Sequence, residues 1–382
     1  MPYYRRNLYV LSLTMFLAAV SWNQVLPFLP LFLKEMGVKR HLMQWSGIVF
    51  AAQSLAAIVT LPYWGKLGDK YGQKQMTIRA GIFLTLIYLG MSICQTPFQL
   101  AALRFLNGAL TGFMPGSITL IATNTPKEMA PRFVATAQTA SAAGQILGPA
   151  LGGFLAAIIG YRGSMQISGI AVLVSTILVL VLVQVKNKPE PSEKTSLLED
   201  FAISFRSPVL LFTMIAVMLY SIYLAAIFPF LTLHLGKMSR HAPQWLTAAP
   251  YSLPPLAFML SAHLWSRIGE RRGYDRAIHI GMLTAGTCAV ALIFVHNIWA
   301  FSLIFFIAGV FLAAISPSAG AIICTRVEEG FRGRAYGMLY SAGTLGALIA
   351  PLVAGQIAAS MGVQMVFVFA GISLLMGSMW LR

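Results

Sequence analysis

The chain has 382 residues, of which 58% are hydrophobic and only 10% are charged, and its mean hydropathy is +0.75. A soluble protein of this length needs a polar surface that this composition does not supply, so an ordinary soluble domain is excluded and an integral membrane protein is predicted. The net charge of +16 does not indicate a nucleic-acid-binding protein, because the basic residues are spread over many short loops and form no continuous patch.

Twelve apolar segments are each long enough, at about 20 residues, to cross the roughly 30 Å hydrocarbon core of a bilayer as a helix. The predicted spans, in chain order, are 8–33, 44–64, 77–95, 98–121, 133–158, 164–185, 208–234, 244–265, 277–296, 298–322, 335–359 and 362–381. The sequence therefore predicts an all-α integral membrane protein with twelve transmembrane helices, whose even number places both termini on one side.

The basic residues predict which side that is. Twenty of the 27 lysines and arginines fall in segments on the side of the N-terminus, and six fall in loops on the other side. Cytoplasmic loops of membrane proteins carry the excess of positive charge, so both termini are expected in the cytoplasm. Arg5 and Arg6 precede a first span that is too long for a cleaved signal, and this span is expected to remain as an anchor.

A single long polar stretch, "KNKPEPSEKTSLLEDFAISFRS" at 186–207, divides the spans into six and six. Its prolines and its cluster of acidic residues are typical of a linker. We therefore expect an N-terminal six-helix bundle at 1–185, a cytoplasmic linker at 186–207 and a C-terminal six-helix bundle at 208–382.

The two halves repeat each other at an offset of 201 or 202 residues. "PFLPLFL" from Pro27 returns as "PFLTLHL" from Pro229, and "GDKYG" at 68–72 returns as "GERRG" at 269–273. "GQILGPALGG" at 144–153 returns as "GALIAPLVAG" at 346–355. Three matches in the same order indicate a duplication, which is the plan of transporters that move two halves about a central site.

These motifs carry a resemblance to a known family. The stretch "GKLGDKYGQK" at 65–74 resembles the loop 2–3 signature of the major facilitator superfamily, and Arg104 with Gly108 resembles its fourth-helix motif. "GQILGPALGG" is similar to the fifth-helix motif of the drug:proton antiporter branch, while "QWSGIVF" (44–50) and "TLIATNTP" (119–126) resemble the MdtG type of multidrug exporter. The resemblance covers essentially the whole chain.

The resemblance implies a monomeric secondary transporter in a bacterial-type plasma (inner) membrane, with no cofactor and no enzymatic activity. It exports small amphipathic molecules by alternating access, with protons as the coupling ion and the lipid bilayer as its only other partner. An alternative remains open: an uncoupled facilitator or importer of a neutral or anionic metabolite. All eleven acidic residues fall in loops or at span ends, and proton-driven exporters commonly use a carboxylate inside the membrane.

The glycine turn within 65–74 has an expected mechanical role. Glycine gives a tight turn its backbone freedom, and the family implies that the acid braces the two halves in the outward-facing state. The expected conformational latch consists of Gly65, Asp69, Lys70, Gly72, Lys74 and, in the second copy, Glu270. Asp69 is expected near the start of the span at 335–359, beside Arg332 and Arg334, where a helix N-terminus favours a carboxylate. The alternative is a solvated turn without a coupling role.

The fifth-span motif predicts close helix packing, because glycines leave a flat helical face and proline permits a bend. The hinge or packing motif consists of Gly144, Gly148, Pro149, Gly152, Gly153 and, in the second copy, Pro351. A seam between the two halves is the functional interpretation, and ordinary packing of small residues in a membrane bundle is the alternative.

The substrate cavity is expected between the spans, lined by polar and aromatic side chains. The candidates are Asn23, Gln24, Gln53, Arg104, Gln138, Tyr220, Tyr223 and Tyr340. Arg104 lies within a span, where a charged side chain needs a cavity or a partner, although an arginine there can also reach the membrane interface. The three scattered cysteines predict no disulfide and no metal site.

Overall fold

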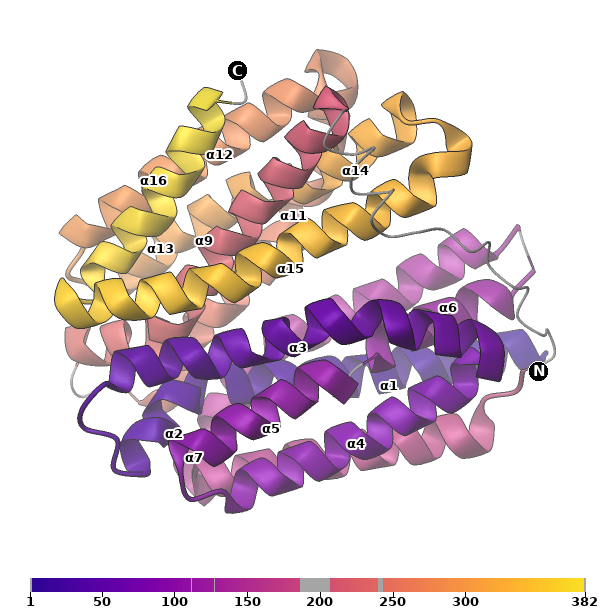
Figure 1. Cartoon of the computed structure of the whole chain (residues 1–382), viewed down its shortest axis with the longest axis horizontal. Helices are drawn as coiled ribbons and strands as arrows, with labels where there is room; N and C mark the ends of the chain where they lie inside the picture. The colour runs from indigo at the N-terminus through magenta and orange to yellow at the C-terminus, as the bar shows by residue number, and fades with distance from the viewer. Residues whose placement is uncertain (1, 111, 127, 186–206, 240–242, 381–382) are drawn as a thin grey trace. The chain divides into compact units, whose positions relative to one another are not determined.

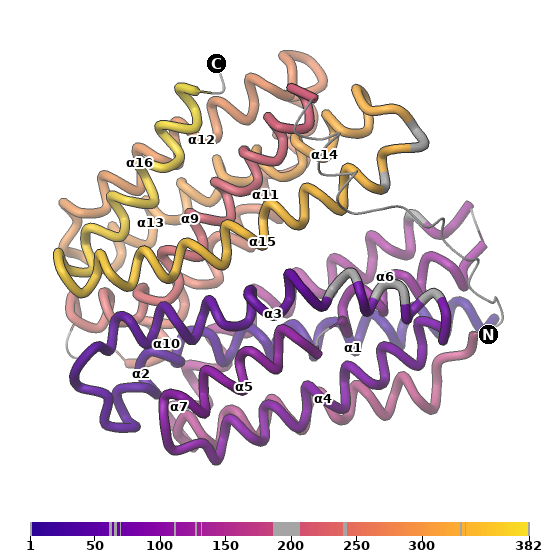
Figure 2. The backbone as a smooth tube through the Cα atoms, viewed as in Figure 1, coloured from indigo at the N-terminus to yellow at the C-terminus, as the bar shows by residue number. Residues whose placement is uncertain are grey.

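The computed structural model describes residues 2–110, 112–126, 128–185, 207–239 and 243–380, and within these ranges every regular element is helical. Figure 1 labels the helices, and Figure 2 follows the same backbone as a tube. The predicted all-α class is therefore confirmed. The predicted linker at 186–207 lies outside the described residues except for Ser207.

The first part of the chain forms helices interrupted at glycine and proline. Its elements are α1 (Tyr3–Val25), η1 (Leu26–Phe28), α2 (Leu29–Glu35), α3 (Leu42–Tyr71), α4 (Gln73–Ile93), α5 (Pro97–Leu110), α6 (Phe113–Thr123) and α7 (Ala130–Leu182). The predicted first span is broken by η1, which contains Pro27. The predicted fourth span is broken between α5 and α6, where Gly112 has a φ of 137° that other residues rarely adopt.

Helix α7 contains two of the predicted spans. Gly160 has non-helical angles (φ 74°, ψ 173°) in its interior and separates two helical segments. Gln24 of α1 meets both segments: its backbone lies against Gly152 and its side chain bonds to Ser164. The two segments therefore lie side by side as a hairpin and pack along α1 and α4.

The second part of the chain follows the same plan. Its elements are α9 (Pro208–Met238), α10 (Gln244–Ala248), η2 (Ala249–Ser252), α11 (Leu253–Arg272), α12 (Tyr274–Ala291), η3 (Leu292–Phe294), α13 (Ile298–Leu312), α14 (Ile315–Arg326), α15 (Glu329–Ser360) and α16 (Gln364–Trp380). The predicted eighth span begins with the short α10 and η2, where Pro250 and Pro254 remove backbone donors. Like the fourth span, the tenth is broken in two, between α13 and α14.

Nine stretches of the described residues are long and apolar enough to cross a membrane. One of these, Arg132–Leu182, contains the α7 hairpin, and the shorter apolar helix Gln364–Trp380 adds a further candidate. Together with the α10–α11 segment, these helices match the twelve predicted spans in number and order.

The chain divides into two compact units. Unit 1 comprises Met1–Met36, Leu55–Glu193 and Pro243–Ser252, and unit 2 comprises Gly37–Ser54, Lys194–Ala242 and Leu253–Arg382. Unit 1 has a core that includes Leu11, Met15 and Phe113. In unit 2, Phe301 packs against Phe305 and Phe367, with ring centroids 5.9 and 5.5 Å apart.

The sequence repeat is visible in the backbone of both units. Gly72 precedes α4 with a φ of 93° and a ψ of 138°, and Gly273 precedes α12 with a φ of 94° and a ψ of 134°. Each of the two amides donates to a glycine carbonyl four residues earlier, at Gly68 and Gly269, over 2.9 Å. The two copies of the glycine turn therefore have the same geometry.

Candidate functional site

Arg104 and Asn107 form a buried polar pair on α5 in unit 1. Their side chains are only 4% and 1% exposed, and a spacing of three residues places both on one face of the helix. The Arg104 guanidinium lies 5.9 Å from the centre of the Trp22 ring on α1. Both amide atoms of Asn107 are buried without a hydrogen-bond partner among the described residues. Buried amides are usually satisfied, so this pair is a candidate for contact with a polar ligand.

Asn107 was not among the predicted cavity residues, although its position one turn from Arg104 was a usable sequence signal. The helix break at Gly112 follows soon after the pair. Irregular backbone at membrane depth is tolerated where it is covered by protein or lines a cavity. The break therefore supports a functional role for this region of unit 1.

The predicted cavity residues of α1 make hydrogen bonds within unit 1. The Asn23 amide donates to Ala19 O of its own helix over 2.8 Å. The Gln24 amide donates to Ser164 O over 3.1 Å and to the Ser168 hydroxyl of α7. Gln24 is 2% exposed, so in this structure it joins α1 to the α7 hairpin.

The other predicted cavity residues differ in burial. Gln138 of α7 is exposed, and Tyr340 of α15 is 62% exposed. Tyr220 is half-buried, whereas Tyr223 is fully buried and its hydroxyl has no hydrogen-bond partner among the described residues. The Gln53 Oε1 atom is likewise buried and unpartnered within that part of the chain.

The two units share the predicted cavity residues equally. Unit 1 holds Asn23, Gln24, Arg104 and Gln138, and unit 2 holds Gln53, Tyr220, Tyr223 and Tyr340. Gln53 and Tyr223 give unit 2 buried polar atoms without a partner among the described residues, and Asn107 gives such atoms to unit 1.

The expected latch residues lie at the end of α3 and the start of α4. Gly65 and Asp69 belong to α3, and the side chain of Asp69 lies outside the described part of the structure. Lys70 is exposed, with its ammonium 5.1 Å from the Tyr71 ring centre, and Glu270 is exposed at the end of α11. The Lys74 ammonium donates to Leu180 O and Val183 O over 2.9 and 2.8 Å.

This contact gives Lys74 a function that the sequence did not predict. The last carbonyls of a helix lack intrahelical partners and carry partial negative charge, so an ammonium there caps the helix. Lys74 therefore fastens the glycine turn to the end of α7.

The glycines of the fifth-span motif contact two different segments within unit 1. Added Cβ atoms at Gly144, Gly148 and Gly152 would meet α1, at distances of 2.5 Å from Phe16 O and 2.8 Å from Asn23 Cβ in the first two cases. A Cβ atom at Gly153 would instead lie 2.6 Å from Trp245 Cα of α10. The motif therefore permits close backbone packing on both faces, and Pro149 leaves α7 continuous up to Gly160.

The second copy of the motif shows the same use of small residues in unit 2. Gly346 of α15 faces α9, and an added Cβ atom would lie 2.5 Å from Met218 O. Further along α15, the carbonyl of Pro351 lies against Gly47 of α3. In this structure Pro351 is therefore part of a close helix contact.

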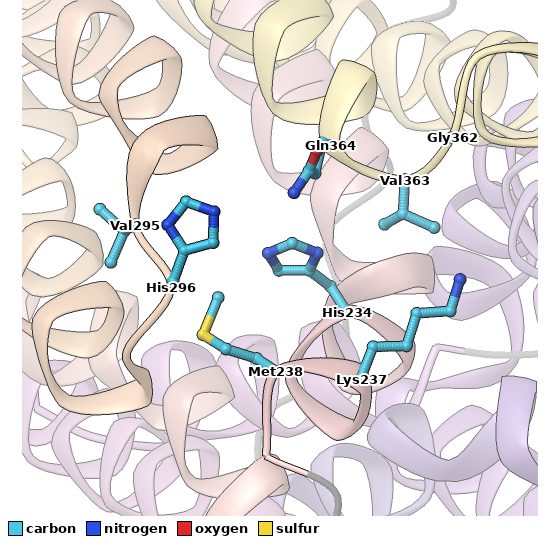
Figure 3. Close-up of a pocket in the computed structure, with 8 residues that line it drawn as sticks. All are labelled: His234, Lys237, Met238, Val295, His296, Gly362, Val363 and Gln364. Atoms are coloured by element: carbon cyan, nitrogen blue, oxygen red, sulfur yellow. The ribbon is translucent and has the colours of Figure 1, made fainter.

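A cavity of about 490 Å³ lies at one end of unit 2 (Figure 3). Its lining residues are His234, Lys237, Met238, Val295, His296, Gly362, Val363 and Gln364. None of the predicted cavity residues lines it. Within the described part of the chain, no group of three or more His, Cys, Asp or Glu residues could hold a metal ion.

The comparisons with known proteins agree with this architecture. The sequence profile of the Major Facilitator Superfamily matches residues 11–294 and 209–382. Multidrug resistance protein MdtG of Serratia proteamaculans is 28% identical over 384 residues, covering 99% of this chain and 93% of that protein. The MdtG protein of Escherichia fergusonii is also 28% identical, covering 95% and 90%.

Among solved structures, the nucleoside transporter NupG matches this chain with a TM-score of 0.82 at 15% sequence identity. The match covers 98% of each chain. At that identity the likeness concerns the fold. The profile match spans both halves of the chain, and the helices follow the same plan in each. The chain therefore belongs to the Major Facilitator Superfamily, and it is a multi-pass membrane transporter and not an enzyme.

Proposed function

We propose that this transporter exports small amphipathic molecules across a bacterial-type plasma membrane by alternating access, coupled to the proton gradient. The similarity to MdtG multidrug resistance proteins over almost the whole chain supports the substrate class and the direction. The observation in the molecule that carries the proposal is the buried pair of Arg104 and Asn107. A buried guanidinium beside an unpartnered amide in a membrane helix is typical of a substrate path.

The expected organisation is part of this proposal. Both termini and the 186–207 linker are cytoplasmic, the chain works as a monomer, and the bundles at 1–185 and 208–382 alternate between two end states. The glycine turn with Asp69 shifts the balance between the two end states.

A second function is favoured by a specific observation about the acidic residues. Within the described helices, the acids lie in the first or last turn, as Glu35, Glu270 and Asp275 do. These acids lie away from the middle of their helices. The charge of the buried pair is that of Arg104, and this positive charge favours an anion. An uncoupled facilitator or importer of a neutral or anionic metabolite is the alternative.

Transport into inverted membrane vesicles separates the two functions. For the exporter, an imposed gradient that is acidic inside the vesicle drives accumulation of an amphipathic dye above its outside concentration, and a protonophore abolishes it. For the facilitator, uptake stops at equal concentrations and does not respond to the gradient. Vesicles carrying Arg104→Ala are the matched control, since they retain the rest of the chain.

A further inference from the structure

The cavity of unit 2 has a buried histidine at its base. His234 is 7% exposed, and its Nε2 atom has no hydrogen-bond partner among the described residues. Its ring packs against Phe301 and Phe367, with centroids 5.6 and 5.0 Å away. Figure 3 shows the imidazole between Gln364 and Met238, with Lys237 and His296 on either side. An imidazole held in an aromatic setting beside a cavity, with a buried nitrogen that has no partner among the described residues, is a candidate ligand contact.

The equivalent place in unit 1 is filled by the protein itself. The sequence repeat aligns His234 with Phe32, and Gly362 and Gln364 with Gly160 and Arg162. Both of these glycines have positive φ, at 74° and 92°, which supports the alignment. The Arg162 guanidinium lies 5.2 Å from the Phe32 ring centre and donates to Ser92 O over 2.8 Å.

The second copy differs from the first at several lining positions, and two of the substitutions act together. Glutamine is shorter than arginine and leaves space where the guanidinium would lie, while histidine replaces an apolar ring by one that can bond. Ordinary drift in a packed core would leave a void lined by apolar atoms. The lining of this void instead includes four polar or basic side chains, those of His234, Lys237, His296 and Gln364.

We propose that the cavity lined by His234, Lys237, His296 and Gln364 is a binding site for a small oxyanion of the phosphate or carboxylate class. The site shares no residue with the proposed substrate path at Arg104. With the predicted orientation it opens at the outer face of the membrane, because it lies at the end of α9 that is remote from the linker.

The charge of the lining residues favours an anion over a metal ion. Lys237 brings a positive charge to the lining, His234, His296 and Gln364 bring polar side chains, and the cavity-lining set contains no aspartate or glutamate. Residues Gly362–Gln364 bring the start of α16 to the cavity, and the free N–H groups of a helix N-terminus attract anions. A cavity of about 490 Å³ also exceeds what a single metal ion needs.

The oxyanion has two possible sources, which are a soluble anion and the phosphate of an anionic lipid. Protein purified in a neutral detergent and in a buffer free of phosphate and carboxylate is titrated calorimetrically with inorganic phosphate. A second titration uses dihexanoyl phosphatidylglycerol, with dihexanoyl phosphatidylcholine as the zwitterionic comparison. Saturable binding of phosphate indicates the soluble source, and binding of the glycerol lipid alone indicates the lipid source.

Two variants place the residues of the first copy in the second. We expect His234→Phe and Gln364→Arg each to weaken oxyanion binding by about tenfold or more, because the first removes a ring N–H that can donate and the second fills the cavity. Lys34→Gln, which removes an exposed charge from unit 1, is the matched control and should bind as the parent does. The thermal unfolding of all three variants is measured in parallel.

A comparison with metal ions provides a readout that distinguishes the ligand class. The groups facing His234 are Lys237 of its own helix, His296 before α13 and the neutral Gln364 of α16, together with the two phenylalanine rings. An oxyanion pairs with the positive charge of the lining, whereas zinc or copper would bind the imidazole nitrogens. Unchanged oxyanion binding in both variants overturns the proposal, as does zinc or copper binding that His234→Phe abolishes in the absence of any oxyanion binding.

Discussion

Trp64 and Trp265 occupy equivalent places in the two units and donate equivalent hydrogen bonds. The Trp64 indole N–H bonds to Ala109 O over 2.6 Å, and the Trp265 indole N–H bonds to Val310 O over 2.7 Å. Both pairs of positions are 201 residues apart in the sequence. Each acceptor lies close to the break in the fourth span of its half, so the bond supports a carbonyl near the point where the regular helix ends.

This relationship predicts unequal losses of stability. Trp265→Phe removes one hydrogen bond and should cost about 1 kcal/mol. Trp64→Ala should cost more than Trp64→Phe, because the Arg79 guanidinium lies 3.3 Å from the Trp64 ring centre and would lose its stacking partner. Thermal unfolding in detergent measures both losses, and equal losses for Trp64→Ala and Trp64→Phe would show that the Arg79 contact adds nothing.

The glycine motif predicts a steric penalty at Gly152. An added Cβ atom would lie 2.7 Å from Gln24 Cα, and backbone cannot move aside as a side chain can. Gly152→Ala should therefore cost about 1–3 kcal/mol through overpacking. Gly337→Ala on α15 is the matched control, because nothing lies within 4 Å of its added Cβ atom, and alanine should leave the melting temperature unchanged or raise it. A stable Gly152→Ala variant would contradict the close packing of α7 on α1.

For the latch, we expect Asp69→Asn to lower transport far more than it lowers expression or ligand affinity. Loss of the charge shifts the populations of the two end states, and such a shift changes turnover without removing a ligand contact. Glu270→Gln, at the second copy of the turn, is the comparison. Transport rate, expression level and ligand binding are measured on the same preparations. Normal transport by the Asp69 variant would leave the turn as a solvated connection.

At the buried polar pair, we expect Arg104→Ala to abolish export of anionic substrates. Arg104→Lys should restore it only in part, because lysine lacks the planar fork that binds an oxyanion with two bonds. Permanent cations such as quaternary ammonium dyes should be poor substrates of the parent, since the guanidinium repels them at low dielectric. Arg267→Ala, at an exposed arginine of α11, is the control. Efflux of a permanent cation equal in parent and Arg104→Ala would reduce Arg104 to an anchor.

The proposed topology is checked by cysteine labelling. In a background without native cysteines, Ser192→Cys and Ser239→Cys should react with a membrane-impermeant maleimide from opposite faces. Only the position 239 variant should be labelled in intact cells, and the position 192 variant should be labelled in inverted vesicles. The exposed native Cys324 must be replaced first, because it follows the predicted tenth span on the cytoplasmic side and would react in inverted vesicles. Labelling of both variants in intact cells would be incompatible with twelve spans and cytoplasmic termini.

The helices of this protein could be predicted because a span is a property of composition and length. The interruptions could not be predicted in the same way. Gly112 lies in a continuous apolar stretch, and glycine is common in membrane helices, so nothing in the pattern distinguishes a break from ordinary packing. Gly160 lies between two predicted spans, and there the prediction of two segments agrees with the structure.

The site residues were harder to predict because membrane helices are apolar on most faces. The usual contrast between a wet and a dry side, which locates a soluble helix face, is absent here. Gln24 therefore resembled a cavity residue in the sequence, whereas the structure shows it bonded to Ser164 and Ser168. The cavity around His234 exists in part because Gln364 stands where the first copy has Arg162. The sequence alone does not show that Arg162 packs on Phe32 and bonds to Ser92 O.

The hydrogen bonds from Lys74 to the end of α7 have a further consequence for how the chain can be divided. They join the end of α7 to the start of α4 just before the linker begins. The Asn7 side chain likewise bonds to the backbone of Gln184, at 2.7 and 3.0 Å. All four bonds use residues before position 186. If the chain is expressed as two polypeptides divided within the linker, the first should therefore keep all four hydrogen bonds. We expect the two polypeptides to assemble into a split transporter.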